Sequence, residues 1–270
     1  MKIYHEIKDF CKELLFNRSL IYELSKRDFQ NNYMGSYLGF IWAFLQPLLF
    51  IFVLDLVFTL GIRGGGKSDD IPFVVYLICG MLAWLYFSSN LMACTNIIRQ
   101  YKFLITKINF KLNTLPVIKL FSSLVVHFIL LAAALVIAML NGIHPGIYAI
   151  QIIYYLFAMM FLLLGIGWIT SSLNVFMKDI SNIVSIIVQF GFWLTPIFWN
   201  IDRVPEQYQW IIKLNPVFYI VNGYRDSFIY QVPFWERPAE TIYFWSFTLI
   251  VTAIGILLFR KLRPYFAESI

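Results

Sequence analysis

A glycine-rich run is the part of the sequence whose spacing comes nearest to a site for chemistry. From Gly61 to Ser68 the chain matches the phosphate-binding loop with which many ATPases cradle their nucleotide. That loop works only between a buried strand and a helix N-terminus, because its backbone N–H groups must converge on phosphate. Here a long apolar stretch precedes the run, and the carboxylates of Asp69 and Asp70, which follow it, would repel phosphate. We therefore reject the match and interpret the run as a flexible connection.

The other polar residues give little support to acid–base or metal chemistry. The histidines, His5, His127 and His144, lie far apart and have no second ligand at helical spacing. Asp55 is the only acid well inside an apolar stretch. An intramembrane carboxylate is a functional candidate, but a single one makes no proton relay, so we favour a helix-packing role. The sequence predicts no catalytic residue, no metal site and no cofactor bound by this chain, with Asp55 and His127 as intramembrane polar residues.

Aromatic side chains offer a third kind of chemistry. They make up 19% of the residues and include Trp42 and Trp84. For a single aromatic residue, an interfacial belt or a core position is the expected role. Aromatic faces also stack on the C–H faces of sugars, and such weak, repeated contacts suit a polymer that slides through a pore. Both interpretations stay open at this point.

Membrane-spanning helices are the elements that must hold these residues. Of 270 residues, 60% are hydrophobic and 13% are charged, whereas a soluble domain has about 45–50% apolar and about 25% charged residues. A span needs about 20 apolar residues, so the chain has no room for a globular catalytic domain. We predict an all-α integral membrane protein with six transmembrane helices within residues 36–262. The apolar stretches cover residues 36–60, 71–95, 115–140, 147–175, 180–199 and 241–259.

Basic residues predict the orientation, because cytoplasmic loops are rich in Lys and Arg. The N-terminal region 1–35, the loop region 96–114 and the tail 263–270 are basic and fall on one side of a six-span arrangement. Both termini are therefore predicted to be cytoplasmic. Region 1–35 has apolar residues at helical spacing and predicts an amphipathic interfacial helix. These regions account for the net charge of +6, so no nucleic-acid partner is expected. Lys119, a turn inside the third stretch, is expected to extend toward the membrane surface.

The external segment 200–240 is more apolar than an ordinary loop. Asn215 followed by Pro216 predicts the start of a helix, with Asn as the N-cap and Pro at the first helical position. That helix is too short and too polar to span a membrane. The alternatives are a short re-entrant helix between the last two spans and a helix lying on the membrane surface.

Three groups of motifs follow one another in a specific order. The first occupies residues 21–28 and 33–39 and continues with Trp42, Gln46 and Pro47. The second occupies residues 174–180, and the third occupies residues 214–219 and 223–225. Together they resemble the ABC-2 type permeases that export lipid-linked polysaccharides, a family that includes the O-antigen, capsule and wall teichoic acid exporters. The resemblance covers nearly the whole chain, although no single motif is diagnostic.

The resemblance implies a homodimer that associates with two copies of a separate ABC ATP-binding subunit, where ATP and Mg would bind. The chain itself would be a transport subunit and not an enzyme. Its substrate would be an undecaprenyl-type lipid-linked glycan, carried across the bacterial plasma (inner) membrane, with membrane lipid around the chain. Candidate contacts to the ATPase are Glu23, Arg99, Lys102, Lys107 and Asn109. Candidates for the substrate path and its outer gate are Lys26, Arg27, Tyr33, Trp42, Tyr219, Tyr224 and Arg225.

Two other classes of membrane protein are alternatives to an exporter. An ion-coupled secondary transporter would have internal repeats, broken helices and several buried charges. A membrane-embedded transferase acting on lipid-linked sugars would need a base or a metal near the interface. The sequence has no convincing repeat, one acid in an apolar stretch and only scattered histidines. These observations disfavour both classes, which are kept as alternatives to the exporter. The sequence does not specify which polymer is carried.

Overall fold

The protein is a bundle of long apolar helices. The computed structural model describes residues 16–33, 39–62, 71–102 and 112–269, and in these ranges every regular element is helical, with no strand. Five helical segments are long and apolar enough to cross a membrane. The all-α membrane fold predicted from composition is therefore confirmed. The helices of these segments are α3 (Gly39–Leu56, continued by a π-helical turn, Val57–Ile62), α4 (Phe73–Gln100), α6 (Leu115–Leu140), α7 (Gln151–Phe176) and α11 (Pro238–Leu262).

The predicted fifth span is shorter than expected. Its helix, α8 (Asp179–Leu194), has 16 residues and ends before the predicted boundary at residue 199. Pro196 explains the early end, because a proline disfavours helical backbone at the residue before it, and Thr195 is extended with ψ at 132°. The prediction of six full spans therefore stays a prediction, with five helical segments of spanning length and one shorter apolar helix.

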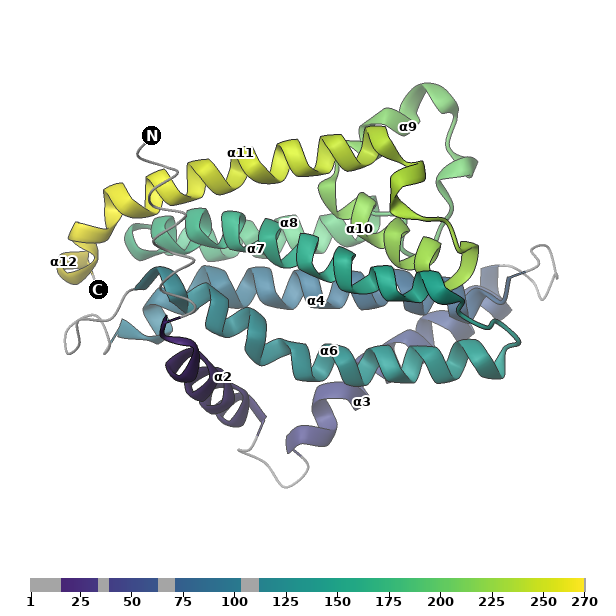
Figure 1. Ribbon diagram of the computed structural model, residues 1–270, viewed down its shortest axis with the longest axis horizontal. Helices are drawn as coiled ribbons and strands as arrows, with labels where there is room; N and C mark the ends of the chain where they lie inside the picture. Colours follow the sequence, from purple (N-terminus) through teal and green to yellow (C-terminus); the bar gives the residue numbers. More distant parts are fainter. Residues whose placement is uncertain (1–15, 34–38, 63–70, 103–111, 270) are drawn as a thin grey trace.

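Helix α4 lies at the centre of the bundle (Figure 1). It packs against α6, α7 and α8, and α11 packs on the far side of α7. Leu77, Ile78 and Met81 of α4 are fully buried. The amphipathic helix α2 (Arg18–Tyr33) packs on α6 at one edge of the bundle, next to α3 (Figure 1). In contrast to α4, α3 has a single buried residue, Ile51.

Small residues let α7 and α11 approach closely. A Cβ atom on Gly165 would lie 2.7 Å from the hydroxyl of Thr252, and one on Gly255 would lie 2.6 Å from the carbonyl of Gly165. Membrane helices pack through such contacts because lipid tails supply no hydrophobic driving force between them. The pair α7–α11 therefore forms a tight unit beside α4.

The connections divide between the two ends of the bundle. Figure 1 shows α9 (Glu206–Lys213) at one end and the C-terminal α12 (Phe266–Ser269) at the other, where α2 also lies. Helix α10 (Pro216–Arg225) follows α9 and ends in a π-helical turn, Asp226–Tyr230. Short 3-10 turns complete the described elements: Leu112–Thr114, Ile147–Ile150, Ile201–Arg203, Phe234–Glu236 and Arg263–Tyr265.

Candidate functional site

A cavity of about 580 Å³ lies between the C-terminal end of α2 and the first half of α3; we call it the α2–α3 cavity. Trp42, on its wall, is 49% exposed, so the cavity opens to the surface. It brings together Tyr33 and Trp42, two of the residues predicted to line a substrate path. Its lining residues are Asn31, Asn32, Tyr33, Gly39, Trp42, Ala43, Gln46, Pro47, Phe50 and Leu85.

The α2–α3 cavity combines polar side chains with apolar and aromatic ones. Its described lining residues include three side-chain amides and no Lys, Arg, Asp or Glu. An amide both donates and accepts hydrogen bonds, which suits sugar hydroxyls. Pro47, inside α3, has no N–H to donate to the carbonyl of Ala43, and this leaves a further acceptor for a hydroxyl. Amides can hydrogen-bond to sugar hydroxyls, and exposed aromatic faces can stack on sugar rings. Together they suit weak binding of neutral sugars.

Aromatic rings connect α2 to α3 beside this cavity. The ring of Phe29 lies 5.1 Å from that of Tyr33 and 5.6 Å from that of Phe40. Phe40 in turn lies 5.7 Å from Phe44. Burial, and then the nearby Asp28 carboxylate, raise the pKa of Tyr33. Its hydroxyl therefore stays protonated and able to donate a hydrogen bond at neutral pH.

A buried ion pair attaches α2 to α6. The Nζ atom of Lys119 lies 2.6 Å from Oδ1 of Asp28, and both side chains are nearly inaccessible. Asp28 also accepts hydrogen bonds from the hydroxyl of Tyr101 at 2.9 Å and from Nδ2 of Asn32 at 3.1 Å. The expectation that Lys119 extends to the membrane surface was therefore wrong. A buried ammonium needs a counter-charge, and α2 supplies one.

The same cluster holds the end of α4. Burial, and then the Asp28 carboxylate, raise the pKa of Tyr101. The phenol therefore stays protonated and keeps donating to Asp28. Ser25, one turn before Asp28, donates to the carbonyl of Ile118 at 3.2 Å. The contacts of α2 with α6 and with the end of α4 thus rest on polar groups.

The described residues among those predicted to contact an ATPase differ in their exposure. Glu23 and Lys102 are exposed. Arg99 is half-buried and donates from Nη2 to the carbonyl of Val175 at 3.4 Å, which links α4 to the end of α7. Lys107 and Asn109 lie outside the described residues, as does most of the run from Gly61 to Ser68. Among the predicted path residues, Lys26 and Arg27 are exposed and do not line the α2–α3 cavity.

At the opposite end, α10 is the short helix that the sequence predicted within segment 200–240. Asn215 caps it, as predicted, by accepting a hydrogen bond from the backbone N–H of Val217 at 3.0 Å. The Asn215 amide also donates to the hydroxyl of Thr195, at the end of α8, at 2.8 Å. Most of α10 is buried, and it packs against α4 and α7. This supports the re-entrant alternative for α10, whereas the preceding α9 has no buried residue.

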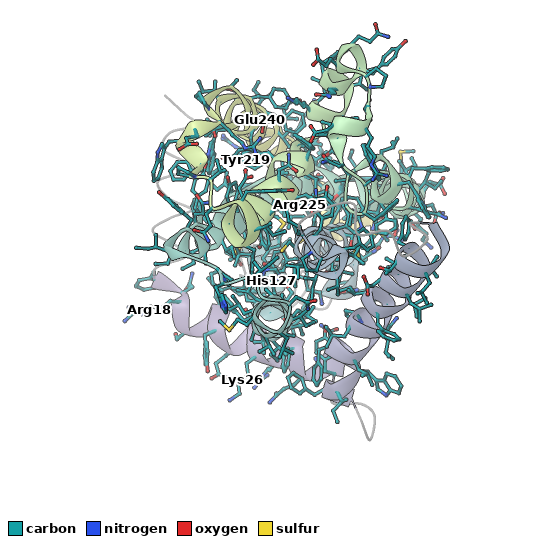
Figure 2. All side chains as sticks on the ribbon, turned by 90° about the vertical axis from the view of Figure 1, so that its right-hand side faces the viewer. Arg18, Lys26, His127, Tyr219, Arg225 and Glu240 are labelled. Atoms are coloured by element: carbon teal, nitrogen blue, oxygen red, sulfur yellow. The ribbon has the colours of Figure 1, made fainter. Side chains whose placement is uncertain are left out.

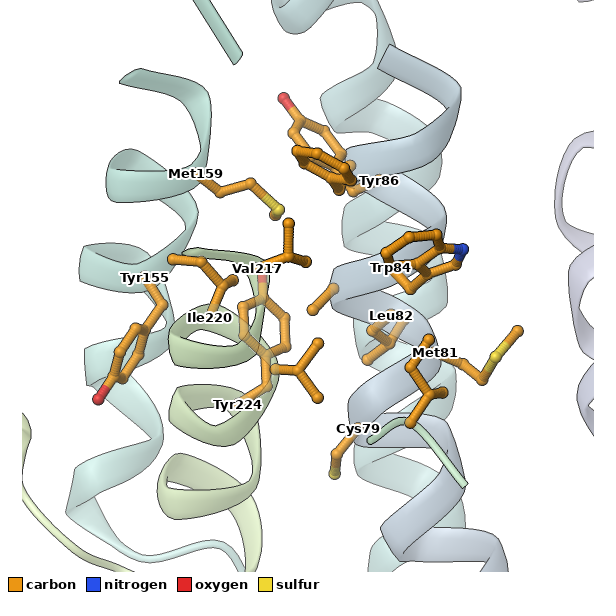
Figure 3. Close-up of a cluster of buried hydrophobic side chains, with 14 of the residues drawn as sticks. Cys79, Met81, Leu82, Trp84, Tyr86, Tyr155, Met159, Val217, Ile220 and Tyr224 are labelled. Carbon is orange, nitrogen blue, oxygen red and sulfur yellow. The ribbon is translucent and has the colours of Figure 1, made fainter. Parts of the chain in front are cut away.

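The predicted gate residues on α10 are all buried in this structure. Tyr219 lies 3.0 Å, hydroxyl to hydroxyl, from both Tyr154 and Thr241. Figure 3 shows Tyr224 between α4 and α7, with Tyr155 on one side and Cys79 on the other. These residues therefore form a closed contact between the spans and do not line an open path.

The guanidinium group of Arg225 makes a hydrogen bond and a cation–π contact inside the bundle. Its Nη2 atom donates to the carbonyl of Ile197 at 2.5 Å, and its Cζ atom lies 3.6 Å from the centroid of the Tyr76 ring. The side chain is 2% exposed and points toward the bundle axis (Figure 2). A buried guanidinium needs such partners, because removal of a charge from water is costly. Arg225 thus ties α10 to α4 and to the segment after α8.

An ion-pair network that the sequence did not indicate fixes the end of the re-entrant segment. Arg237 contacts Asp226 at 2.7 Å through Nε and donates to it from Nη2 at 3.0 Å. Glu240 lies 4.0 Å from Arg237 and 3.7 Å from Lys213. Burial raises the pKa of Asp226, and Arg237 opposes that rise. The network joins α9, α10 and α11.

The two predicted intramembrane polar residues have separate surroundings. His127 is buried, and its Nε2 atom lies 3.0 Å from the Tyr224 hydroxyl, so it pairs α6 with α10. Asp55 is half-buried and accepts a hydrogen bond from Thr59 of its own helical segment at 3.3 Å. Neither joins the α2–α3 cavity. His127 has a partner on another helix, whereas Asp55 has no hydrogen-bond partner from another helix in the part of the chain that the structure describes.

Comparison of the sequence with known proteins identifies the family of this chain. The sequence profile of the ABC-2 type transporter family matches residues 19–229. The chain belongs to the ABC-2 type transporter family. The chain is 28% identical over 263 residues to the O-antigen export system permease protein RfbA of Myxococcus xanthus, covering 96% of this chain and 98% of that relative. It is 30% identical over 261 residues to the protein of the same name in Klebsiella pneumoniae, covering 92% and 94%.

A more distant relative extends the comparison beyond O-antigen. The polysialic acid transport protein KpsM of Escherichia coli is 22% identical over 228 residues, which cover 83% of this chain and 85% of that protein. The chain has several helices long and apolar enough to cross a membrane, and it belongs to a family of membrane transporters. It is therefore a multi-pass membrane protein. The resemblance inferred from the sequence motifs is confirmed at the level of the family.

Proposed function

We propose that this chain is the permease subunit of an ATP-driven exporter that moves a lipid-linked polysaccharide out of the cytoplasm. The relatives named for O-antigen export and polysialic acid transport support a polysaccharide cargo. The observation that carries the proposal for this chain is the α2–α3 cavity, where amides and aromatic rings meet without a charged lining residue. A metabolite transporter for charged solutes would need paired charges there.

The energy for transport would come from a separate ATP-binding subunit. Family membership supports such a partner, and we propose two copies of each subunit in the bacterial plasma membrane, with both termini cytoplasmic. Glu23 and Lys102 are exposed at the α2 end and are available to contact the ATPase. Movement of α2 would then be passed on to α6 and α4 through the Asp28 ion pair.

We further propose that the cargo enters at the α2–α3 cavity and leaves beside α10. In the described state α10 fills the space between α4 and α7 at the outer end. A path through that end requires the contacts of Tyr219, Tyr224 and Arg225 to open. ATP binding in the partner would supply the free energy for this step, and the lipid tail would stay in the bilayer.

The first experiment is copurification followed by a transport assay. The chain is expressed with the ATP-binding protein encoded beside it and purified through a tag on this chain, and ATP hydrolysis is measured. We expect a complex with equal numbers of the two subunits and ATPase activity. A chain that purifies alone, while the polymer still reaches the cell surface, would remove the exporter proposal and favour an ion-coupled transporter.

The second experiment tests the cavity. Trp42→Ala removes an exposed aromatic face from the α2–α3 cavity, and Trp235→Ala removes one that is 61% exposed at the opposite end. Loss of one stacking contact costs roughly 1–3 kcal/mol per bound ring for flat ligands, so we expect polymer at the cell surface to fall severalfold for Trp42→Ala only. Equal export by both variants, at equal amounts of complex, would show that the cavity is not on the path.

A further inference from the structure

A second cavity, of about 500 Å³, lies between α2 and α6; we call it the α2–α6 groove. It is separate from the α2–α3 cavity, and the two share no lining residue. Its walls come from one face of α2 and one face of α6. The lining residues are Arg18, Ile21, Tyr22, Ser25, Lys26, Phe29, Val117, Phe121, Ser122 and Val125.

The α2 wall presents cations beside apolar groups. Arg18, Tyr22, Lys26 and Phe29 recur at helical spacing and so share one face. Arg18 and Lys26 are exposed (Figure 2), and the lining contributed by the described residues has no acid. Glu23, the exposed acid of α2, is not part of the lining. This face therefore attracts an anion at the level where α2 meets the membrane.

The α6 wall is apolar and open to the side. Val117, Phe121 and Val125 follow one another at four-residue spacing, which gives a strip roughly 12 Å long at 1.5 Å per residue. Phe121 is 49% exposed and Val125 is 45% exposed, so an apolar chain reaches this strip from the bilayer. The length suits the upper part of one acyl chain and is far too short for a polyprenyl chain.

We propose that the α2–α6 groove binds an anionic phospholipid of the surrounding bilayer. The phosphate lies between Arg18 and Lys26, and one acyl chain follows the Val117–Val125 strip of α6. An amphipathic helix with cations on its polar face binds anionic lipid in this way. The bound lipid fills the α2–α6 groove, which adjoins the α2–α3 cavity where the ring of Phe29 meets that of Tyr33. Binding needs neither ATP nor the exported polymer, so the inference does not rest on the proposed function.

Native mass spectrometry of the purified full-length chain tests this inference. The chain is exchanged into micelles that contain equal amounts of phosphatidylglycerol and phosphatidylcholine, and the lipid retained per chain is counted. Each cation near an anionic surface strengthens attraction about fivefold, so the double variant Arg18→Gln/Lys26→Gln should retain phosphatidylglycerol about 30-fold less strongly. The matched control, Lys178→Gln/Lys261→Gln, removes two exposed cations outside the groove and should retain it like wild type.

A second pair of variants tests the apolar wall without changing any charge. Val125→Trp fills the groove, while Phe128→Trp changes a side chain that is 49% exposed on α6 but not part of the lining. We expect Val125→Trp alone to lose the retained phosphatidylglycerol. Equal retention of phosphatidylcholine would overturn the proposal, as would equal loss in both members of either pair. Displacement by undecaprenyl phosphate at lower concentration than by phosphatidylglycerol would assign the groove to the transported lipid instead.

Discussion

The buried ion pair between Asp28 and Lys119 makes a quantitative prediction about how firmly α2 is held. Substitution Asp28→Asn removes the charge that faces Lys119 Nζ at 2.6 Å and leaves the ammonium buried at 8% exposure. Breaking a buried pair by removing one partner costs about 3–5 kcal/mol. Substitution Lys119→Met leaves the Asp28 carboxylate with Tyr101 and Asn32 as donors, so its cost should be smaller.

The double variant Asp28→Asn/Lys119→Met separates the ion pair from a general effect on folding. Replacing a whole buried pair by neutral groups is often neutral or stabilising. We therefore expect the double variant to be more stable than Asp28→Asn alone, by at most the cost of that single substitution, about 3–5 kcal/mol.

Hydrogen exchange of the α2 amides is the assay, because α2 detaches locally when the pair is lost. A change of about 3–5 kcal/mol lowers protection roughly 100- to 4000-fold. The amides of α11, which do not contact the pair, serve as an internal control. Unchanged α2 protection in Asp28→Asn, or a double variant as labile as that single one, would refute the role of the pair.

Three further predictions concern the re-entrant helix, each measured as thermal stability of the purified chain. Gly223→Ala should destabilise by about 1–3 kcal/mol or more, because its Cβ would lie 2.1 Å from the buried Tyr155 ring; a wild-type melting temperature would contradict this. Tyr224→Phe should cost about 1–3 kcal/mol, since it leaves His127 without its partner at 3.0 Å; no loss would mean that His127 finds another. Arg225→Lys should cost about 1.5–3 kcal/mol, because an ammonium lacks the planar fork; full stability would show that charge alone matters.

Exposed positions at the ends of the bundle supply the controls. Tyr265→Phe changes a tyrosine that is 56% exposed, and Lys178→Gln changes an exposed cation. Surface substitutions of this kind stay within about 0.5 kcal/mol. If these controls melted as early as the α10 variants, the losses would reflect general fragility of the chain in detergent and not the contacts of α10.

Features that depend on local sequence were predictable. The third apolar stretch, residues 115–140, matches α6 because length and hydropathy decide where a membrane helix can lie. The cap at Asn215 was visible because a side-chain acceptor followed by proline is a local signal. Pro196 is also a local signal, because it predicts that α8 ends early. The prediction from the length of the apolar stretch did not use it.

The candidate site depended on contacts between distant residues, and these were not predictable from one sequence. Asp28 and Lys119 are separated by 91 positions. Each has a separate explanation when viewed alone, as a surface acid on an amphipathic helix and as a lysine near a helix end. The burial of α10 between α4 and α7 likewise follows only from packing. Tyr33 and Trp42 were predicted together because both belong to the motif that resembles the ABC-2 type permeases, and both line the α2–α3 cavity.

Helix α2 connects all these features, because it contributes residues to each of them. Asn32 and Tyr33 line the α2–α3 cavity, Lys26 and Phe29 line the α2–α6 groove, and Asp28 pairs with Lys119 of α6. A helix so surrounded cannot move toward one cavity without changing the other. Since the ion pair is buried and its loss is costly, α2 should move together with α6 and with the end of α4, and not slide past them. A force applied to α2 from the cytoplasm would then act on the bundle as a whole.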